Sequence, residues 1–224
     1  MFDVTWQSPA SFTLADRDTE LLARLEPHDD PARPATEAFI AGRFALEHGA
    51  RIAHFLPYLL TLRAGDQRLQ AAVGLRLAQD QTLFLETYLD QPVEACLAVV
   101  LGQPIARGEV VEVGNLAALS AGQARLLIVV TTWLLARSGL RWVTFTGATR
   151  LINSFHRLGL APQILAAADP ARLGAERERW GSYYANDPQV CAGDIQQGYR
   201  QLLQGGIFAR LGLATLAAED SHVA

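Results

Sequence analysis

The amino-acid sequence predicts an α/β (α+β) fold, a single domain in which a mixed central sheet is flanked by helices. The chain has 224 residues, of which 50% are hydrophobic, and this is enough to bury a core of its own. The run VVEVGNLAAL, residues 110–119, is too continuously apolar for a half-exposed strand. A helix that starts near Gln123 separates it from a second strand, residues 142–147. This order predicts a parallel pair of strands inside the sheet.

The first part of the chain predicts one loose segment and one packed helix. Residues 1–35 are charged and rich in turn formers towards their end, so we expect a loosely packed N-terminal segment of strand and loop. Apolar residues at helical spacing predict a helix over residues 36–48. Thr36 is suited to its N-cap and Gly49 follows its end.

Between this helix and the central strand, the sequence predicts three strands and a helix. Residues 58–62 and 69–77 are expected to form two antiparallel strands around a glycine-containing turn. Residues 83–88 predict a third short strand or an extended edge. Residues 93–101 predict a helix that Pro92 opens.

The end of the chain predicts two more helices and a tail. A short helix containing Asn153 follows the second strand of the parallel pair, and residues 194–203 predict the final helix. We therefore divide the chain into the N-terminal segment, a main domain over residues 36–204, and a C-terminal tail over residues 205–224. The tail is apolar and could pack on a second copy of the chain as a homodimer.

Composition excludes several classes of function. All 19 basic residues are Arg, so a P-loop lysine, a Schiff-base lysine and a pyridoxal-phosphate (PLP) anchor are excluded. The net charge of -4 and the scattered Arg residues argue against nucleic acid as a partner.

Cysteine usage and hydropathy predict a cytoplasmic protein. Cys96 and Cys191 lie far apart and lack metal-ligand spacing, which predicts no metal site and a reducing compartment. The N-terminus lacks the basic start and apolar core of a secretory signal. The longest apolar run, residues 126–136, is well short of the roughly 20 residues that span a bilayer.

Two charged residues on predicted strands are candidates for chemistry. Glu112 has Val on both sides, and a carboxylate buried there needs a partner or has a raised pKa. It could act as a general base towards an attacking amine, or form a structural pair with Arg76. The guanidinium of Arg76 in turn could bind the carboxylate of a substrate that accepts a transferred group, through two parallel hydrogen bonds. Alternatively, it could only pair with Glu112.

The turn SAGQAR, residues 120–125, is a candidate phosphate-binding segment. Its small residues leave backbone N–H groups accessible at the start of a helix, where a pyrophosphate or a pantetheine amide can bind. A Ser-Ala-Gly turn that merely caps the helix is the alternative.

Six ordered blocks resemble a known family. They are GARIAHFLPYLL (49–60), AAVGLRLA (71–78), LFLETYLDQPVE (83–94), EVVEVGNLA (109–117), WVTFT followed by NSFHRLGL (142–160), and WGSYY (180–184). Together they resemble the thermostable hemolysin family over about residues 39–204. The same blocks are similar to the autoinducer-producing acyl-homoserine-lactone synthases, a branch of the GNAT fold.

The resemblance implies a GNAT-like fold and an acyltransferase. The donor would be a fatty acyl group on acyl carrier protein (ACP) or coenzyme A (CoA), the acceptor a small amine, and the reaction a direct attack without an acyl-enzyme. Glu112 matches a functional Glu of the synthases. The thioester would be held by the backbone amides of Leu116, Ala117 and Ala118. The pantetheine or phosphate would bind at the turn, by Ala121, Gly122, Gln123, Ala124 and Arg125.

Two further residues follow from the comparison with the synthases. Asn115 stands where they have an Arg, so it can orient an acceptor by hydrogen bonds but supplies no charge. His54 lies where they have a Trp and acidic residues. It could act as a base or contact the acceptor, or it could be a satisfied core residue.

Several aromatic positions complete the set of candidates. Many GNAT enzymes protonate the departing thiolate with a Tyr, and Phe155 occupies that position here. His156 projects about 100° from it on a helix and is expected on the surface. Trp180, Tyr183 and Tyr184 could close the acceptor pocket or cover the edge of the sheet.

Two other functions remain open. The family name suggests a membrane-active haemolysin. A catalytically inactive GNAT-like domain that only binds ligands is the other alternative.

Overall fold

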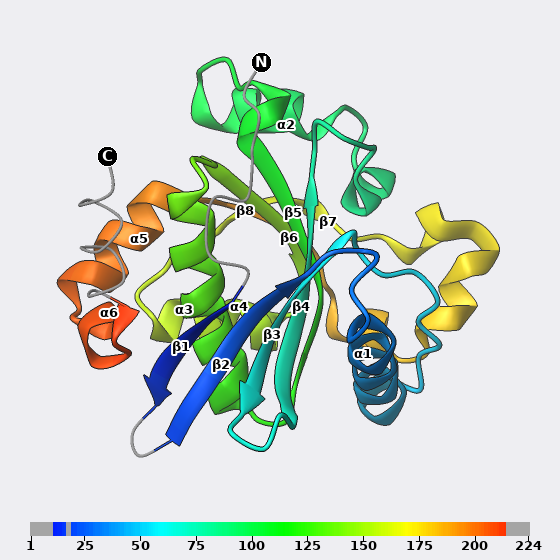
Figure 1. Cartoon of the computed structure of the whole chain (residues 1–224). Helices are drawn as coiled ribbons and strands as arrows, with labels where there is room; N and C mark the ends of the chain where they lie inside the picture. The colour runs from blue at the N-terminus through cyan, green and yellow to red at the C-terminus, as the bar shows by residue number, and fades with distance from the viewer. Residues whose placement is uncertain (1–10, 17–18, 214–224) are drawn as a thin grey trace.

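One eight-stranded sheet organises the described part of the chain (Figure 1). The computed structural model describes residues 11–16 and 19–213. The strand order is β1-β2-β3-β4-β5-β6-β8-β7. The strands are β1 (Ser11–Asp16), β2 (Thr19–Glu26), β3 (Tyr58–Ala64), β4 (Leu69–Leu77), β5 (Val110–Ala118), β6 (Trp142–Gly147), β7 (Gln163–Ala167) and β8 (Gln189–Asp194).

Helices cover both faces of the sheet. Helix α1 (Arg33–His48) lies on one face, and α3 (Ala121–Arg137) packs on the other with α5 (Ile195–Gln204) (Figure 1). The remaining helical elements are α2 (Val93–Leu101), α4 (Thr149–Arg157), α6 (Ile207–Arg210) and the 3-10 segments η1 (Phe84–Tyr88), η2 (Arg107–Glu109), η3 (Pro170–Trp180) and η4 (Tyr183–Asn186). The predicted mixed sheet flanked by helices is confirmed.

The parallel pair predicted for the centre of the sheet is β5 with β6. It runs from Val110 opposite Trp142 to Val113 opposite Phe145. Within the described chain, no residues of β5 and β6 pair beyond this point, although β5 continues to Ala118 and β6 to Gly147. Beside this point β5 also shifts register against β4. The two central strands therefore separate at their carboxyl ends, where ligands bind in open sheets of this kind.

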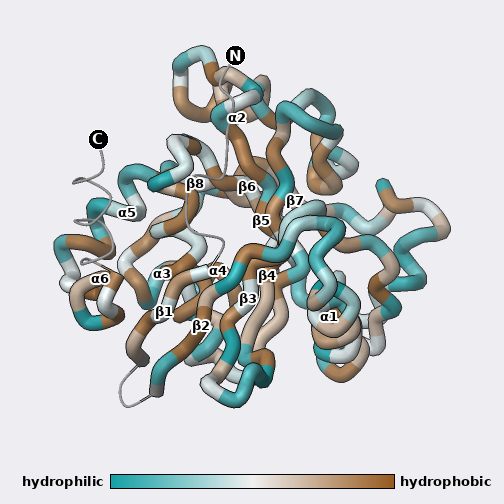
Figure 2. Tube along the Cα trace, in the orientation of Figure 1, coloured by the Kyte–Doolittle hydropathy of each residue, from teal (hydrophilic) through white to brown (hydrophobic). Residues whose placement is uncertain are grey.

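The core divides between the two faces because side chains alternate along each strand. Val73, Leu75 and Val111 pack with buried residues of α3 in the larger cluster. Ala72 and Ala117 face Ile40 of α1 on the other side. Hydrophobic residues are frequent along β5 and α3 (Figure 2).

Several predicted elements are confirmed with shifted ends. The hairpin β3–β4 and the helix α2 after Pro92 form as expected. Helix α5 begins after Asp194, whose carboxylate accepts the N–H of Gln197 at 2.8 Å. Helix α1 begins at Arg33, ahead of the predicted N-cap Thr36, because a Pro fits its first turn and the hydroxyl of Thr36 instead donates to Glu26 at 2.7 Å.

The strand or extended edge predicted for residues 83–88 is wrong. The segment Phe84–Tyr88 is the 3-10 helix η1. Its start is fixed by a carboxylate, since Glu86 accepts the N–H groups of Leu83 at 2.8 Å and Val93 at 2.9 Å. These contacts satisfy backbone groups locally and leave the segment out of the sheet.

The N-terminal segment is more tightly integrated than the sequence indicated. Its described residues form β1 and β2 at one edge of the sheet, and Phe12 packs its ring 4.9 Å from that of Trp133. The charged, turn-rich stretch over residues 26–34 is ordered locally, because Asp30 accepts hydrogen bonds from Arg24 at 2.7 Å and from the N–H of Ala32 at 2.8 Å. Residues 1–10 and 17–18 lie outside the described residues.

The described part of the C-terminal tail packs on its own chain. Phe208, Leu211 and Leu213 are buried in the larger core cluster. The N–H of Ala15 donates to the carbonyl of Leu211 at 3.1 Å, which joins the tail to β1. Residues 214–224, which belong to the segment expected to pack on a second copy, lie outside the described residues.

Candidate active site

A cavity of about 1160 Å³ passes through the opening between β5 and β6. On the α3 face it is lined by aliphatic residues that include Val113, Ile128 and Leu135. On the α1 face it is lined by Glu112, Arg76 and several aromatic residues. Its volume exceeds the usual range for one small ligand, roughly 300–1,000 Å³.

Glu112 is buried at the narrow end of this opening, with 4% of its surface exposed. Both carboxylate oxygens accept backbone N–H groups of η1, from Leu85 at 2.9 Å and from Phe84 at 3.1 Å. Burial raises the pKa of Glu112, and these two bonds together with Arg76 oppose the rise. The carboxylate keeps further lone pairs for a proton or a water.

Arg76 lies directly opposite Glu112 in the register of β4 and β5. Its Nη1 is 3.7 Å from the Oε2 of Glu112 and donates to the carbonyl of Thr82 at 3.2 Å. Its Nε is buried and has no hydrogen-bond partner among the described residues. The pair with Glu112 predicted from the sequence is thus present, but it is loose and does not use all the donors of Arg76.

Asn115 anchors a loop beside the register shift. Its Oδ1 accepts the N–H of Leu56 at 3.0 Å and its Nδ2 donates to the carbonyl of His54 at 3.4 Å. Its φ of 52° lies in the left-handed region, which Asn tolerates better than most residues. Gly74 allows the close approach, because a Cβ there would lie 2.8 Å from the Cβ of Leu56.

His54 lines the cavity from this loop and has an exposed side chain. The alternative that it is a satisfied core residue is therefore wrong. Arg33 holds the same loop from α1, since it donates to the carbonyls of Leu56 at 2.6 Å and Pro57 at 2.7 Å.

The donor segment differs in detail from the prediction. Helix α3 begins at Ala121, and Ser120 caps it by accepting the N–H of Gln123 at 3.2 Å. The capping interpretation thus holds for Ser120. The candidate residues that line the cavity are Leu116, Ala117, Ala118, Ala121 and Ala124, whereas Gly122, Gln123 and Arg125, although described, are not among its lining residues.

Aromatic residues far apart in sequence meet on the α1 face. Trp180, Tyr183 and Tyr184, for which two locations remained open, all line the cavity. Tyr184 shares a hydrogen bond with Tyr88 through their hydroxyls, and Tyr183 donates to the carbonyl of Thr146 at 3.3 Å. Burial raises the pKa of all three tyrosines.

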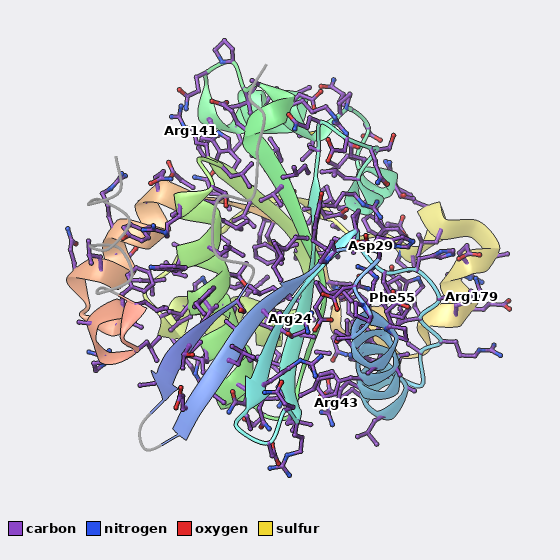
Figure 3. All side chains as sticks on the ribbon, in the orientation of Figure 1. Arg24, Asp29, Arg43, Phe55, Arg141 and Arg179 are labelled. Carbon is purple, nitrogen blue, oxygen red and sulfur yellow. The ribbon has the colours of Figure 1, made fainter. Side chains whose placement is uncertain are left out.

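The segment that carries these rings is docked tightly on the end of α1. The N–H of Ser182 donates to the carbonyl of His48 at 2.8 Å, and that of Arg51 to the carbonyl of Arg179 at 2.6 Å. Gly181 is required here, because a Cβ would lie 2.0 Å from the His48 oxygen. Phe55, Arg43 and Arg179 lie on this side of the sheet (Figure 3).

Sequence reasoning missed Phe44, Phe84, Tyr88 and Thr146 as lining residues. The block 83–94 contained a signal, because two aromatic residues four apart suit one side of a helical turn, but it suggested a strand. Phe155 stacks on Phe145 with ring centroids 4.7 Å apart, and His156 is exposed as expected. In the part of the chain that the structure describes, no group of three or more His, Cys, Asp or Glu could hold a metal ion.

The order of these segments along the chain matches a known family. A family model described as Thermostable hemolysin matches residues 26–199. The chain belongs to the thermostable hemolysin family. This confirms the resemblance carried by the six blocks. No curated protein sequence matches the chain.

Solved structures confirm the GNAT-like fold shared with acyl-homoserine-lactone synthases. FeeM, an N-acyl amino acid synthase from uncultured soil microbes, is 16% identical, with 84% of this chain and 98% of that chain covered and a TM-score of 0.56. The acyl-homoserine-lactone synthase LasI is 6% identical, with 79% and 91% covered and a TM-score of 0.56. TofI in an apo form is 16% identical, with 80% and 95% covered and a TM-score of 0.55.

Proposed function

We propose that this protein is an acyltransferase. It moves a fatty acyl group from the phosphopantetheine thioester of CoA or ACP to a small amine acceptor. The observation that carries this proposal is the cavity that passes through the opening between β5 and β6. Its two ends differ in chemistry, one aliphatic and one with Glu112 and Arg76. Two substrates can therefore meet at the opening from opposite faces.

The donor end is supported by the position of α3. The start of this helix lies next to the β5 residues Leu116, Ala117 and Ala118, and small residues of both elements line the cavity. Helix N-termini bind phosphate and amide groups, which suits a pantetheine arm entering there. The acyl chain would then occupy the aliphatic part of the cavity beneath α3.

The acceptor end is supported by Glu112. Burial holds its pKa above the ordinary value, which brings a carboxylate closer to the range of an effective general base. It would take the proton of the attacking nitrogen directly or through water. The amine nitrogen bonds to the carbonyl carbon, the carbon–sulfur bond breaks, and the sulfur leaves and ends as the thiol with one proton.

Arg76, Asn115 and His54 would take supporting roles at this end. The Nε of Arg76 has no hydrogen-bond partner among the described residues. The guanidinium group would therefore bind the carboxylate of an acceptor. Asn115 would act through the loop that it anchors, so its effect on the acceptor is indirect. His54 is exposed to the cavity and would contact the acceptor from that loop.

The test is a transfer assay with two donors and several amines. Purified protein is mixed with acyl-CoA or acyl-ACP, and both thiol release and the mass of the N-acyl product are measured. We expect amine-dependent thiol release matched by product. Absence of product with every amine and both donors would contradict the proposal and leave an inactive binding module as the better description.

The same preparation tests the literal meaning of the family name. Among the described residues, no helix is long and apolar enough to cross a membrane. We expect the purified protein not to release dye from liposomes, whereas a long-chain N-acyl amine, being an amphiphile, should do so. Dye release by the pure protein without donor or acceptor would favour the membrane-active alternative.

A further inference from the structure

Six aromatic rings line the acceptor end of the cavity. We define the aromatic box as the rings of Phe44, Phe84, Tyr88, Trp180, Tyr183 and Tyr184, all of which line the cavity. Trp180 lies among them, with ring centroids 5.4 Å from Tyr183, 5.6 Å from Phe84 and 6.4 Å from Phe44. These rings come from α1, η1 and the η3–η4 region, so only the fold brings them together.

The three tyrosine hydroxyls of the box are hydrogen-bonded within the protein. The hydroxyls of Tyr88 and Tyr184 bond to each other, and that of Tyr183 donates to the carbonyl of Thr146. The rings therefore offer apolar faces and edges to a ligand. Aromatic walls of this kind favour an aromatic or bulky apolar group, which can stack or meet them edge-on.

Charged groups at the same end of the cavity pair with one another. Arg43 lies 2.8 Å from Glu47, and Arg179 lies 3.4 Å from Glu176. These four residues are partly exposed and line the cavity around the box. Arg76 differs, since it lies across from Glu112 with its Nη1 3.7 Å from the carboxylate, too far for a hydrogen bond.

We infer that the acceptor is an α-amino acid with an aromatic or large apolar side chain. This inference rests on the proposed function. The side chain enters the aromatic box, the carboxylate binds Arg76, and the amino group lies at the opening near Glu112. Nitrogen bonds to the acyl carbon, the carbon–sulfur bond breaks, the thiol leaves, and an N-acyl amino acid forms.

The acyl chain is the other group that could fill the box. The aliphatic end of the cavity already provides for it, because Val113, Ile128 and Leu135 lie on the α3 face, the same side as the donor helix. A chain placed in the box would leave that end empty. It would also occupy the space beside Arg76 that the acceptor needs.

The experiment compares acceptors with the unmodified protein. Octanoyl-CoA is supplied with glycine, alanine, leucine, phenylalanine, tyrosine and the uncharged phenylalanine amide, and product is quantified by mass. We expect kcat/KM for phenylalanine to exceed that for alanine by about tenfold or more, the span that apolar pockets achieve. The amide should be poorer than phenylalanine by about tenfold or more, because it leaves the charge of Arg76 unmatched.

Two variants localise the effect. Trp180→Ala should lower the ratio of kcat/KM for phenylalanine over alanine by about tenfold. Tyr199→Leu is the matched control, because Tyr199 stacks on Phe208 outside the cavity, and the ratio should stay unchanged. Each variant is also assayed with octanoyl-CoA and tetradecanoyl-CoA.

The outcomes separate the two proposals. Product with glycine and alanine as efficient as with phenylalanine would overturn the inference while the acyltransferase remains. A Trp180→Ala effect on donor length, with the acceptor ratio unchanged, would also overturn it, because the box would then hold the acyl chain. No product with any acceptor would instead remove the proposed function itself.

Discussion

Two Glu–Arg pairs join adjacent strands of the sheet, and they differ in how closely the two side chains approach each other. Glu26 is 0% exposed and binds Arg63 at 2.9 Å and Thr36 at 2.7 Å. Glu112 is 4% exposed, but its distance to Arg76 is 3.7 Å and its oxygens are held by backbone N–H groups. The first pair is not among the residues that line the cavity, whereas both members of the second pair line it.

This difference indicates which pair serves stability and which is available for chemistry. The Glu26–Arg63 pair is joined by a direct hydrogen bond and does not line the cavity, so it has little to offer a ligand. A buried carboxylate with a raised pKa and a cation that is not hydrogen-bonded to it, both at one cavity, are typical of a functional site. The comparison also supplies a matched control for each substitution at the site.

The largest expected effect is on transfer activity. Glu112→Gln should lower kcat/KM by about a hundredfold or more, because the amide cannot accept a proton. Glu26→Gln should retain the activity per folded molecule, since Glu26 is not among the residues that line the cavity. Steady-state kinetics with one acyl-CoA measures both. Equal losses in the two variants would show that Glu112 matters only for folding.

The second effect is on stability, where the substitution in the Glu26–Arg63 pair should have the larger effect. Glu26→Gln leaves Arg63 buried without its counter-charge, which costs about 3–5 kcal/mol of unfolding free energy. Glu112→Gln keeps one oxygen for the η1 N–H groups but presents an NH₂ to the other, a loss of about 1–3 kcal/mol. Denaturant titrations measure both values. A larger loss for Glu112→Gln would make its pair the structural one.

How far the sequence predicted the molecule depends on how local each signal was. The elements β5, α3 and β6 follow from periodicity and length within one stretch of chain. The 3-10 helix η1 was missed because Glu86 and Glu112, rather than its own propensity, fix its backbone. The charged N-terminal cluster suggested a loose segment, but Asp30 orders it through contacts only two and six residues away.

The candidate site shows the same limit. Glu112 and Arg76 were identifiable because charged residues in apolar strands stand out. The aromatic box was identifiable only in part. Trp180, Tyr183 and Tyr184 stand together in one block, whereas Phe44, Phe84 and Tyr88 lie elsewhere in the chain and look like ordinary core residues. Asn115 was placed correctly on β5, but its amide contacts the backbone of a loop some sixty positions away.

A third effect tests how the site pair is held in place. Glu86 binds Arg107 at 2.7 Å and fixes η1, whose N–H groups hold Glu112. Hydrogen bonds from Arg107, Val93 and Leu83 outweigh burial and lower the pKa of Glu86 to about 2. Glu86→Gln should therefore cost about 1–2 kcal/mol at neutral pH, less than the full pKa shift would give because solvent screens the partly exposed pair. The stabilisation by Glu86 exists above its unfolded pKa and is lost as pH falls towards 2, so the gap between wild type and variant should close there.

The smallest effect concerns the sign of the pH dependence at Glu112. Its folded pKa is raised above 4.5, so the folded state binds this proton more tightly than the unfolded state. The contribution of Glu112 to stability is therefore greatest at low pH and declines as pH rises from 4.5 through the folded pKa. In Glu112→Gln this titration is absent, so the stability of wild type relative to the variant should decline over that window, by at most about 1.4 kcal/mol per pH unit. Unfolding at a series of pH values measures the difference. A stability gap that widens as pH rises would mean that Arg76 and the η1 N–H groups outweigh burial, and Glu112 would then resemble Glu86 rather than a base.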